Sequence, residues 1–131
     1  MRQKSAVLID DEPDITTYLS TLLVDHGWRV RAANRAADGL KLLQDERPDV
    51  LLLDLMMPEQ GGLSVLVAVR KDERLKELPV VLVSGIQEKL TTDYHAYIER
   101  FKHYRPNAFV DKPVDATQLL ATLEQVTAIQ A

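Results

Sequence analysis

The chain has 131 residues, enough for one domain with a sizeable buried core. Its 46% hydrophobic and 27% charged residues are typical of a soluble globular protein, and its net charge of −4 argues against a nucleic-acid-binding surface. The absence of cysteine excludes disulfides and thiolate metal sites. No run reaches the ~18 apolar residues of a membrane span, and the first run is too short for a signal peptide. We therefore expect a cytoplasmic protein without a membrane partner.

Short apolar runs recur along the chain, and most of them lack polar alternation. Such runs, rich in Val and Leu, are typical of strands that are buried on both faces of a parallel sheet. A run of lower apolar content, residues 29–33, is expected to form a further strand. The other predicted strands are Ala6–Ile9, Val50–Leu53, Val80–Val83 and Ala108–Val110.

Helical patterns fill the first two intervals between these strands. An apolar stripe at helical spacing predicts a helix that begins just after Pro13 and ends near Gly27. Asn34 is expected to cap a second helix, which ends before Pro48. The residues of the first stripe are Ile15, Tyr18, Leu19, Leu22 and Leu23.

Three more helices are predicted in the second half of the chain. One covers about Gly62–Asp72, another follows Gly85, and a pattern resembling a capping box at Asp115–Gln118 opens the last one. Strands that alternate with helices in this way indicate an α/β protein with a parallel sheet and helices on both faces.

Polar residues follow four of the predicted strands directly. Asp10 and Asp11 follow the first strand, Asp54 follows 50–53, Ser84 follows 80–83, and Lys112 lies just beyond 108–110. Because parallel strands end at the same edge of a sheet, and ligands of open α/β sheets bind there, these groups should converge.

The converging groups suit a divalent cation and a phosphoryl group. The carboxylates of Asp10, Asp11 and Asp54 would repel one another unless a cation neutralised them, and hard oxygen ligands favour Mg²⁺. An aspartate can also attack phosphorus to give an acyl phosphate. Lys112 can supply a positive charge to the phosphoryl oxygens and Ser84 a hydroxyl donor.

Four motifs in this order carry a resemblance to a known family. They are Val7-Leu8-Ile9-Asp10-Asp11-Glu12-Pro13, Leu53-Asp54-Leu55-Met56-Met57-Pro58, Val83-Ser84-Gly85 and Phe109-Val110-Asp111-Lys112-Pro113. Together they closely resemble the receiver domain of two-component response regulators. The resemblance implies a flavodoxin-like (βα)5 doubly wound parallel sheet with strand order 2-1-3-4-5. It covers nearly the whole chain, so we expect a single receiver domain over residues 1–131, with a core at about 4–127 and no output domain.

The same resemblance implies a role for each acidic residue. Asp54 would be the phosphoacceptor and would receive its phosphoryl group from a histidine kinase or a phosphotransfer protein. Asp11 and Asp54 would bind Mg²⁺ through their side chains and Met56 through its backbone carbonyl, with Asp10 assisting. Such a domain is a signalling module rather than an enzyme, catalysing only its own phosphoryl transfer and slow autodephosphorylation.

The resemblance also implies a switch. Ser84 and Lys112 would contact the phosphoryl oxygens, and Phe109 matches the aromatic rotamer-switch position. Phosphorylation would then change the face formed by the fourth helix, the fifth strand and the fifth helix, and so control binding of an unidentified downstream protein or output domain.

The stretch between Ser84 and Lys112 departs from the family because it is longer than usual. Aromatic residues at helical spacing lie within it, and either an extended helix packs them on the core or they form a partner surface, including a homodimer contact. These residues are Tyr94, Tyr97, Phe101 and Tyr104.

Two other functions compete with this interpretation. A haloacid-dehalogenase-type phosphatase also forms an aspartyl phosphate, but it requires an aspartate two residues after the nucleophile, where this chain has Met56. A degenerate receiver would bind partners without phosphorylation, and the intact Asp11, Asp54, Ser84 and Lys112 argue against it.

Overall fold

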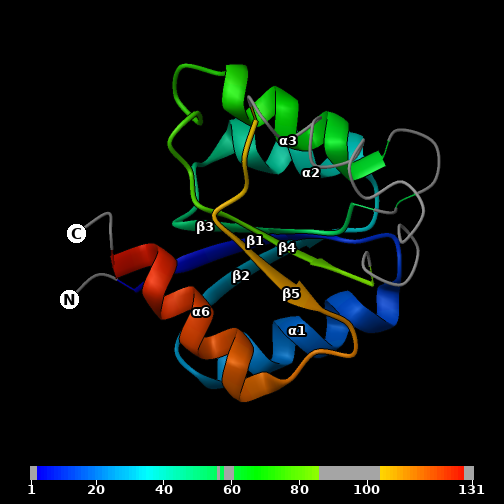
Figure 1. Cartoon of the computed structure of the whole chain (residues 1–131), viewed down its shortest axis with the longest axis vertical. Helices are drawn as coiled ribbons and strands as arrows, with labels where there is room; N and C mark the ends of the chain where they lie inside the picture. The colour runs from blue at the N-terminus through cyan, green and yellow to red at the C-terminus, as the bar shows by residue number, and fades with distance from the viewer. Residues whose placement is uncertain (1–2, 56, 58–60, 86–103, 129–131) are drawn as a thin grey trace.

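The fold is a five-stranded parallel sheet in the order β2-β1-β3-β4-β5 (Figure 1). The computed structural model describes residues 3–55, 57, 61–85 and 104–128. The strands are β1 (Ser5–Ile9), β2 (Arg29–Ala33), β3 (Val50–Leu53), β4 (Val80–Ser84) and β5 (Ala108–Asp111). This arrangement confirms the predicted α/β class and the strand order 2-1-3-4-5.

Helices cover both faces of the sheet, with α1 and α6 on one side and α2 and α3 on the other (Figure 1). The helices within the described residues are α1 (Pro13–Asp25), α2 (Ala36–Asp45), α3 (Gly61–Lys71) and α6 (Ala116–Ala128). The predicted fourth helix falls on residues 86–103, which lie outside the described part of the chain.

The central strands are apolar throughout because both of their faces are buried. Alternate residues of a strand point to opposite faces, so Val7 and Ile9 pack in the layer under α2 and α3. Ala6 and Leu8 pack in the layer under α1 and α6, together with helix residues such as Leu23. Two separate apolar layers therefore hold the sheet between its helices, which is why no polar alternation is seen in the sequence.

Two details of the predicted helices are wrong. Tyr18 belongs to the expected apolar stripe of α1 but is 48% exposed, whereas Leu19 and Leu23 of the same stripe are buried as predicted. Asn34 does not cap α2, because the residue at the N-cap is Arg35 and no side-chain cap hydrogen bond is made there. By contrast, Asp115 does cap α6, since its Oδ1 accepts the backbone N–H of Gln118 at 2.9 Å.

In the part of the chain that the structure describes, the helices are too short or too polar to span a bilayer.

The direction of the strands determines where polar residues of the sheet meet. Strands β1, β3, β4 and β5 all point the same way, so the residues after Ile9, Leu53 and Val83 meet at one edge.

Candidate functional site

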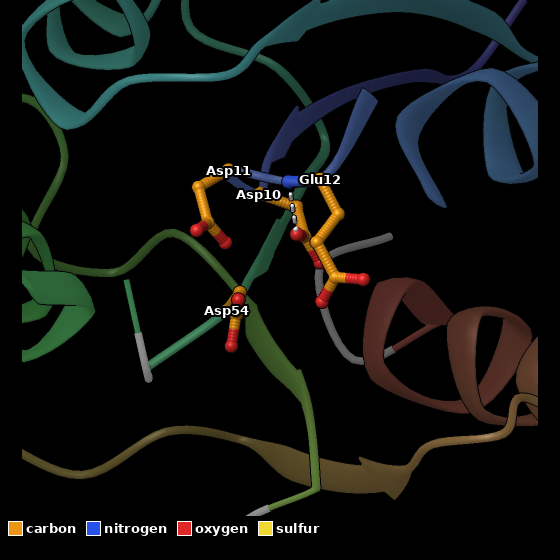
Figure 2. Close-up of side chains that lie close together, drawn as sticks. All are labelled: Asp10, Asp11, Glu12 and Asp54. Atoms are coloured by element: carbon orange, nitrogen blue, oxygen red, sulfur yellow. Dashed lines mark hydrogen bonds between the residues drawn. The ribbon is translucent and has the colours of Figure 1, made fainter. Parts of the chain in front are cut away.

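Four acidic residues gather at the carboxyl edge of the sheet (Figure 2). Asp10 and Asp54 lie next to each other because they follow neighbouring parallel strands in which Ile9 pairs with Leu53. Both are 4% exposed. Asp11 and Glu12 continue from Asp10 into the start of α1, and one carboxylate oxygen from each of the four residues lies within 4.8 Å of the others.

Lys112 reaches this cluster from the end of β5. Its Nζ lies 2.8 Å from Oδ2 of Asp10, 3.2 Å from Oε1 of Glu12 and 3.6 Å from Oδ2 of Asp54. The Lys112 side chain is 17% exposed, so its charge faces those of Asp10 and Asp54 largely out of solvent, whereas Glu12 is exposed. A single ammonium thus offsets part of a concentrated negative charge.

The carboxylate of Asp10 is held on both of its oxygens. Oδ1 accepts the backbone N–H of Glu12 at 2.9 Å, the bond drawn in Figure 2, and Oδ2 lies against Lys112. Asp10 is thereby fixed in place, whereas its neighbour Asp11 is partly exposed at the rim.

The electrostatic environment disfavours the charged form of two carboxylates. Burial raises the pKa of Asp10, and the Asp54 charge adds to this, although the bonds from Lys112 and from the Glu12 N–H oppose it. The pKa of Asp11 is also raised, by burial first and then by the nearby Asp54 carboxyl. For Lys112, burial acts to lower the pKa, but the hydrogen bond to Asp10 and the surrounding carboxylates outweigh it and the pKa is raised.

Backbone packing around Asp54 depends on a glycine. The Asp54 N–H donates to the Ile9 carbonyl at 2.9 Å, which keeps this residue in line with the sheet. The first turn of α3 then passes so close that a Cβ on Gly62 would overlap the Asp54 carbonyl oxygen. A glycine at this position therefore allows α3 to begin directly against the Asp54 backbone.

The donor set fits a small, hard divalent cation. Carboxylate oxygens that converge from two neighbouring strands are the ligands Mg²⁺ prefers, and their mutual repulsion is what such a cation would relieve. Of the residues predicted to bind it, Asp10, Asp11 and Asp54 come together in this structure, and Met56 lies outside the described residues.

The other predicted residues are described to different extents. Ser84 is the last residue of β4, and its backbone pairs with Asp111 of β5. Phe109 lies on the edge strand β5 and is 51% exposed. Tyr104 is partly buried, with the Lys71 Nζ 5.8 Å from its ring centroid. Tyr94, Tyr97 and Phe101 lie outside the described residues.

The structure adds two residues that the sequence did not single out as part of the site. Glu12 joins the acidic cluster and bonds Lys112, and its adjacency to Asp11 was an available signal. Asn34 reaches the site from the end of β2, donating to the Asp10 carbonyl at 2.8 Å. From the sequence, its residue type and its position before a predicted helix indicated a helix cap. The contact with Asp10 could not be seen there, because the two residues are 24 positions apart.

Comparison with known sequences identifies the family. The response regulator receiver domain family matches residues 6–124. The chain is 31% identical over 122 residues to protein PilH of Pseudomonas aeruginosa, covering 93% of this chain and 96% of PilH. It is also 33% identical to the DNA-binding transcriptional regulator NtrC of Proteus hauseri, covering 95% of this chain but only 25% of NtrC. The chain therefore matches nearly the full length of PilH but only about a quarter of the length of NtrC.

Solved structures agree with the sequence comparison. The chemotaxis protein CheY4 of Vibrio cholerae superposes with a TM-score of 0.84 at 25% identity, covering 95% of this chain and 99% of that one. A CheY-like receiver domain protein of Methanospirillum hungatei, at 21% identity, shares the fold with a TM-score of 0.86, covering 98% and 97% of the two chains. With the family match over most of its length and an acidic cluster at the carboxyl edge of the sheet, this chain belongs to the response regulator receiver domains of two-component signalling.

Proposed function

We propose that this receiver domain accepts a phosphoryl group on Asp54 in a Mg²⁺-dependent reaction, from a histidine kinase or a phosphotransfer protein. Asp10, Asp11 and Asp54 would hold the cation with the Met56 carbonyl. Bound Mg²⁺ would offset the negative charge of the incoming phosphoryl oxygens.

The transfer would proceed by attack of an Asp54 carboxylate oxygen on the phosphorus of a phosphohistidine. An O–P bond forms as the P–N bond breaks, and the departing imidazole keeps the electron pair and takes up a proton from solvent. Lys112 would stabilise the transferring group, since its ammonium lies 3.6 Å from Asp54 and the reaction depends chiefly on positioning and charge.

The proposed output is a change in partner binding. Ser84 and Lys112 would bind the new phosphoryl oxygens, and the response would spread through β4 and β5 to Phe109 and the α6 side of the molecule. The partner would be a downstream protein, an output domain or a second copy of the chain. We also propose slow autodephosphorylation, because the positions two residues after Asp54 and Ser84 hold Met56 and Ile86, which cannot hydrogen-bond an attacking water.

The observation that carries this proposal is the position of the Lys112 ammonium. It is brought from β5 across the end of β4 to lie between Asp10 and Asp54, at 2.8 and 3.6 Å. An ammonium held against two buried carboxylates is suited to bind the phosphoryl dianion that would form when one of those carboxylates is phosphorylated.

The test is phosphorylation with acetyl phosphate, followed by intact-mass measurement with and without Mg²⁺. The wild-type protein should gain the mass of one phosphoryl group only with Mg²⁺, and Asp54→Asn should gain none, because the attacking carboxylate is gone. Decay of the added mass measures the autodephosphorylation rate.

Asp111→Asn is the matched control, since Asp111 is also an acid at the end of a strand but on the exposed edge. It should be phosphorylated like the wild type. Full phosphorylation of Asp54→Asn would assign the acceptor to another residue, and a wild type that is never modified would favour a receiver that acts without phosphorylation.

A further inference from the structure

Asn34 connects three segments of the chain beside the acidic cluster. Its Nδ2 donates to the Asp10 carbonyl at 2.8 Å and to the Thr16 hydroxyl at 3.1 Å. A carbonyl oxygen can only accept, so the amide nitrogen must face Asp10, and both of its N–H groups are used. One side chain at the end of β2 thereby joins the end of β1 to the first turns of α1.

Thr16 extends this connection to the first residue of α1. Its side chain is buried, and its hydroxyl donates to the Pro13 carbonyl at 3.1 Å, which leaves the oxygen to accept from Asn34. The bonds thus run from Pro13 through Thr16 and Asn34 to Asp10. They fix the start of α1 relative to the peptide that joins Asp10 to Asp11.

That peptide fixes the backbone position from which the Asp11 side chain extends. The Asp10 N–H donates to the Ala33 carbonyl at 3.2 Å, and the Asp10 carbonyl accepts from Asn34, so both sides of the residue are tied to the end of β2. Asp11 follows immediately and is the more exposed carboxylate. Because Asp11 and Asp54 are like charges, their repulsion acts to move the two residues apart, and a held peptide keeps the Asp11 backbone beside Asp54.

We propose that Asn34 is a positioning residue for the cation site, holding the Asp10–Asp11 peptide so that the Asp11 carboxylate stays within binding distance of Asp10 and Asp54. This inference rests on the proposed Mg²⁺ site. Asn34 does not touch the cation and acts through the backbone of its ligands, as groups behind a metal ligand commonly do.

The test is Mg²⁺ binding to the phosphate-free protein, measured by titration calorimetry. Asn34→Ala should weaken Mg²⁺ binding about tenfold, the usual cost of losing such a supporting group. Its phosphorylation by acetyl phosphate should be slowed at low Mg²⁺ and should return to the wild-type rate at saturating Mg²⁺, because the ligands themselves remain. Should Asn34→Ala fail to fold, Asn34→Leu keeps the size of the side chain while removing both donors.

Asn107→Ala is the matched control, because Asn107 also bridges backbone segments but lies at the opposite end of the sheet. Its Oδ1 accepts the Val80 N–H at 2.8 Å and an Arg70 N–H at 2.9 Å. This variant should lose stability and keep wild-type Mg²⁺ affinity. Equal affinity of folded Asn34→Ala and wild type, or an equal loss in Asn107→Ala, would overturn the positioning role and leave the proposed function intact. A wild type that does not bind Mg²⁺ would overturn the proposed function, and this inference with it.

Discussion

Asp10 and Asp11 are neighbours in sequence but differ in how their charges are balanced. Asp10 is buried, and the negative charge of its carboxylate is offset by Lys112 at 2.8 Å and by the Glu12 N–H. The surroundings of Asp11 mostly disfavour its charged form, since burial and the Asp54 charge both raise its pKa. Before a cation binds, ionisation of Asp11 therefore lowers the stability of the fold.

Removing the Asp11 charge should stabilise the metal-free protein. A carboxyl group with a raised pKa in the folded state binds protons more tightly there than in the unfolded chain, so stability falls as the pH rises through that range. Asp11→Asn should raise the metal-free melting temperature at pH 7 by a few degrees, and the gain should shrink toward pH 4. Differential scanning calorimetry at several pH values measures both effects.

Added Mg²⁺ should give the wild type a higher melting temperature than Asp11→Asn, the reverse of the metal-free order. The wild type should be stabilised by the cation and Asp11→Asn much less, because a charged ligand is missing. Asp14→Asn, an exposed acid in the first turn of α1, serves as the control and should follow the wild type. A metal-free Asp11→Asn no more stable than Asp14→Asn would argue against repulsion at Asp11.

At the scale of elements, α3 joins the site to the region before β5. Gly62 in its first turn lies against the Asp54 backbone, and Arg70 lies in its last turn. The Arg70 guanidinium donates to the carbonyls of Arg105 at 3.0 Å and Leu78 at 2.6 Å, as well as to Asn107. This one side chain therefore ties the helix to the segments that lead into β4 and β5.

Arg70→Ala should lower the free energy of unfolding by roughly 2 kcal/mol, since hydrogen bonds from a charged donor are lost and backbone carbonyls lose their partners. Urea denaturation measures this change. Among the described residues, Lys71→Ala removes the contact with Tyr104, at 5.8 Å from the ring centroid, and should cost less. Mg²⁺ affinity should stay unchanged in both variants, and a loss in Arg70→Ala would mean that α3 transmits strain to the acidic cluster.

At the scale of the whole molecule, the sheet separates the site from the proposed output. The acids lie at the carboxyl edge, whereas Phe109 lies within the edge strand β5, which carries Lys112 just beyond its end. A phosphoryl group that displaces Lys112 from Asp10 would therefore pull on the same strand that presents Phe109.

Hydrogen exchange with and without beryllofluoride, a phosphoryl mimic, tests this route. Added to the Mg²⁺-bound protein, the mimic should change protection in residues 85–110, which include the aromatic positions Tyr94, Tyr97, Phe101 and Tyr104. Asp54→Asn should show no change under the same conditions. Uniform protection across 85–110 in the wild type would mean that the lengthened stretch is only structural.

Much of this protein was predictable from local sequence properties. Apolar runs such as Val50–Leu53 lack alternation because both faces of a central strand are covered, and that predicted the parallel sheet before any contact was known. The residue after each strand is also local information, so Asp10, Asp54 and Lys112 could be placed at one edge. Their chemical roles stay predictions.

The tertiary structure alone decided how these residues are held. Asn34 is 24 residues from Asp10, and Lys112 is 100 residues from Glu12, so neither contact leaves a signal in the local pattern. Asn34 is a residue type that often caps helices by accepting a backbone N–H, and only the tertiary structure shows that its amide nitrogen donates to the Asp10 carbonyl. Tyr18 fits the apolar stripe of α1 but lies beyond the width of the face that the sheet covers. The sequence determined which elements form and what each strand end carries, whereas the packing of distant segments decided which donors meet which acceptors, because a hydrogen bond depends on positions in space.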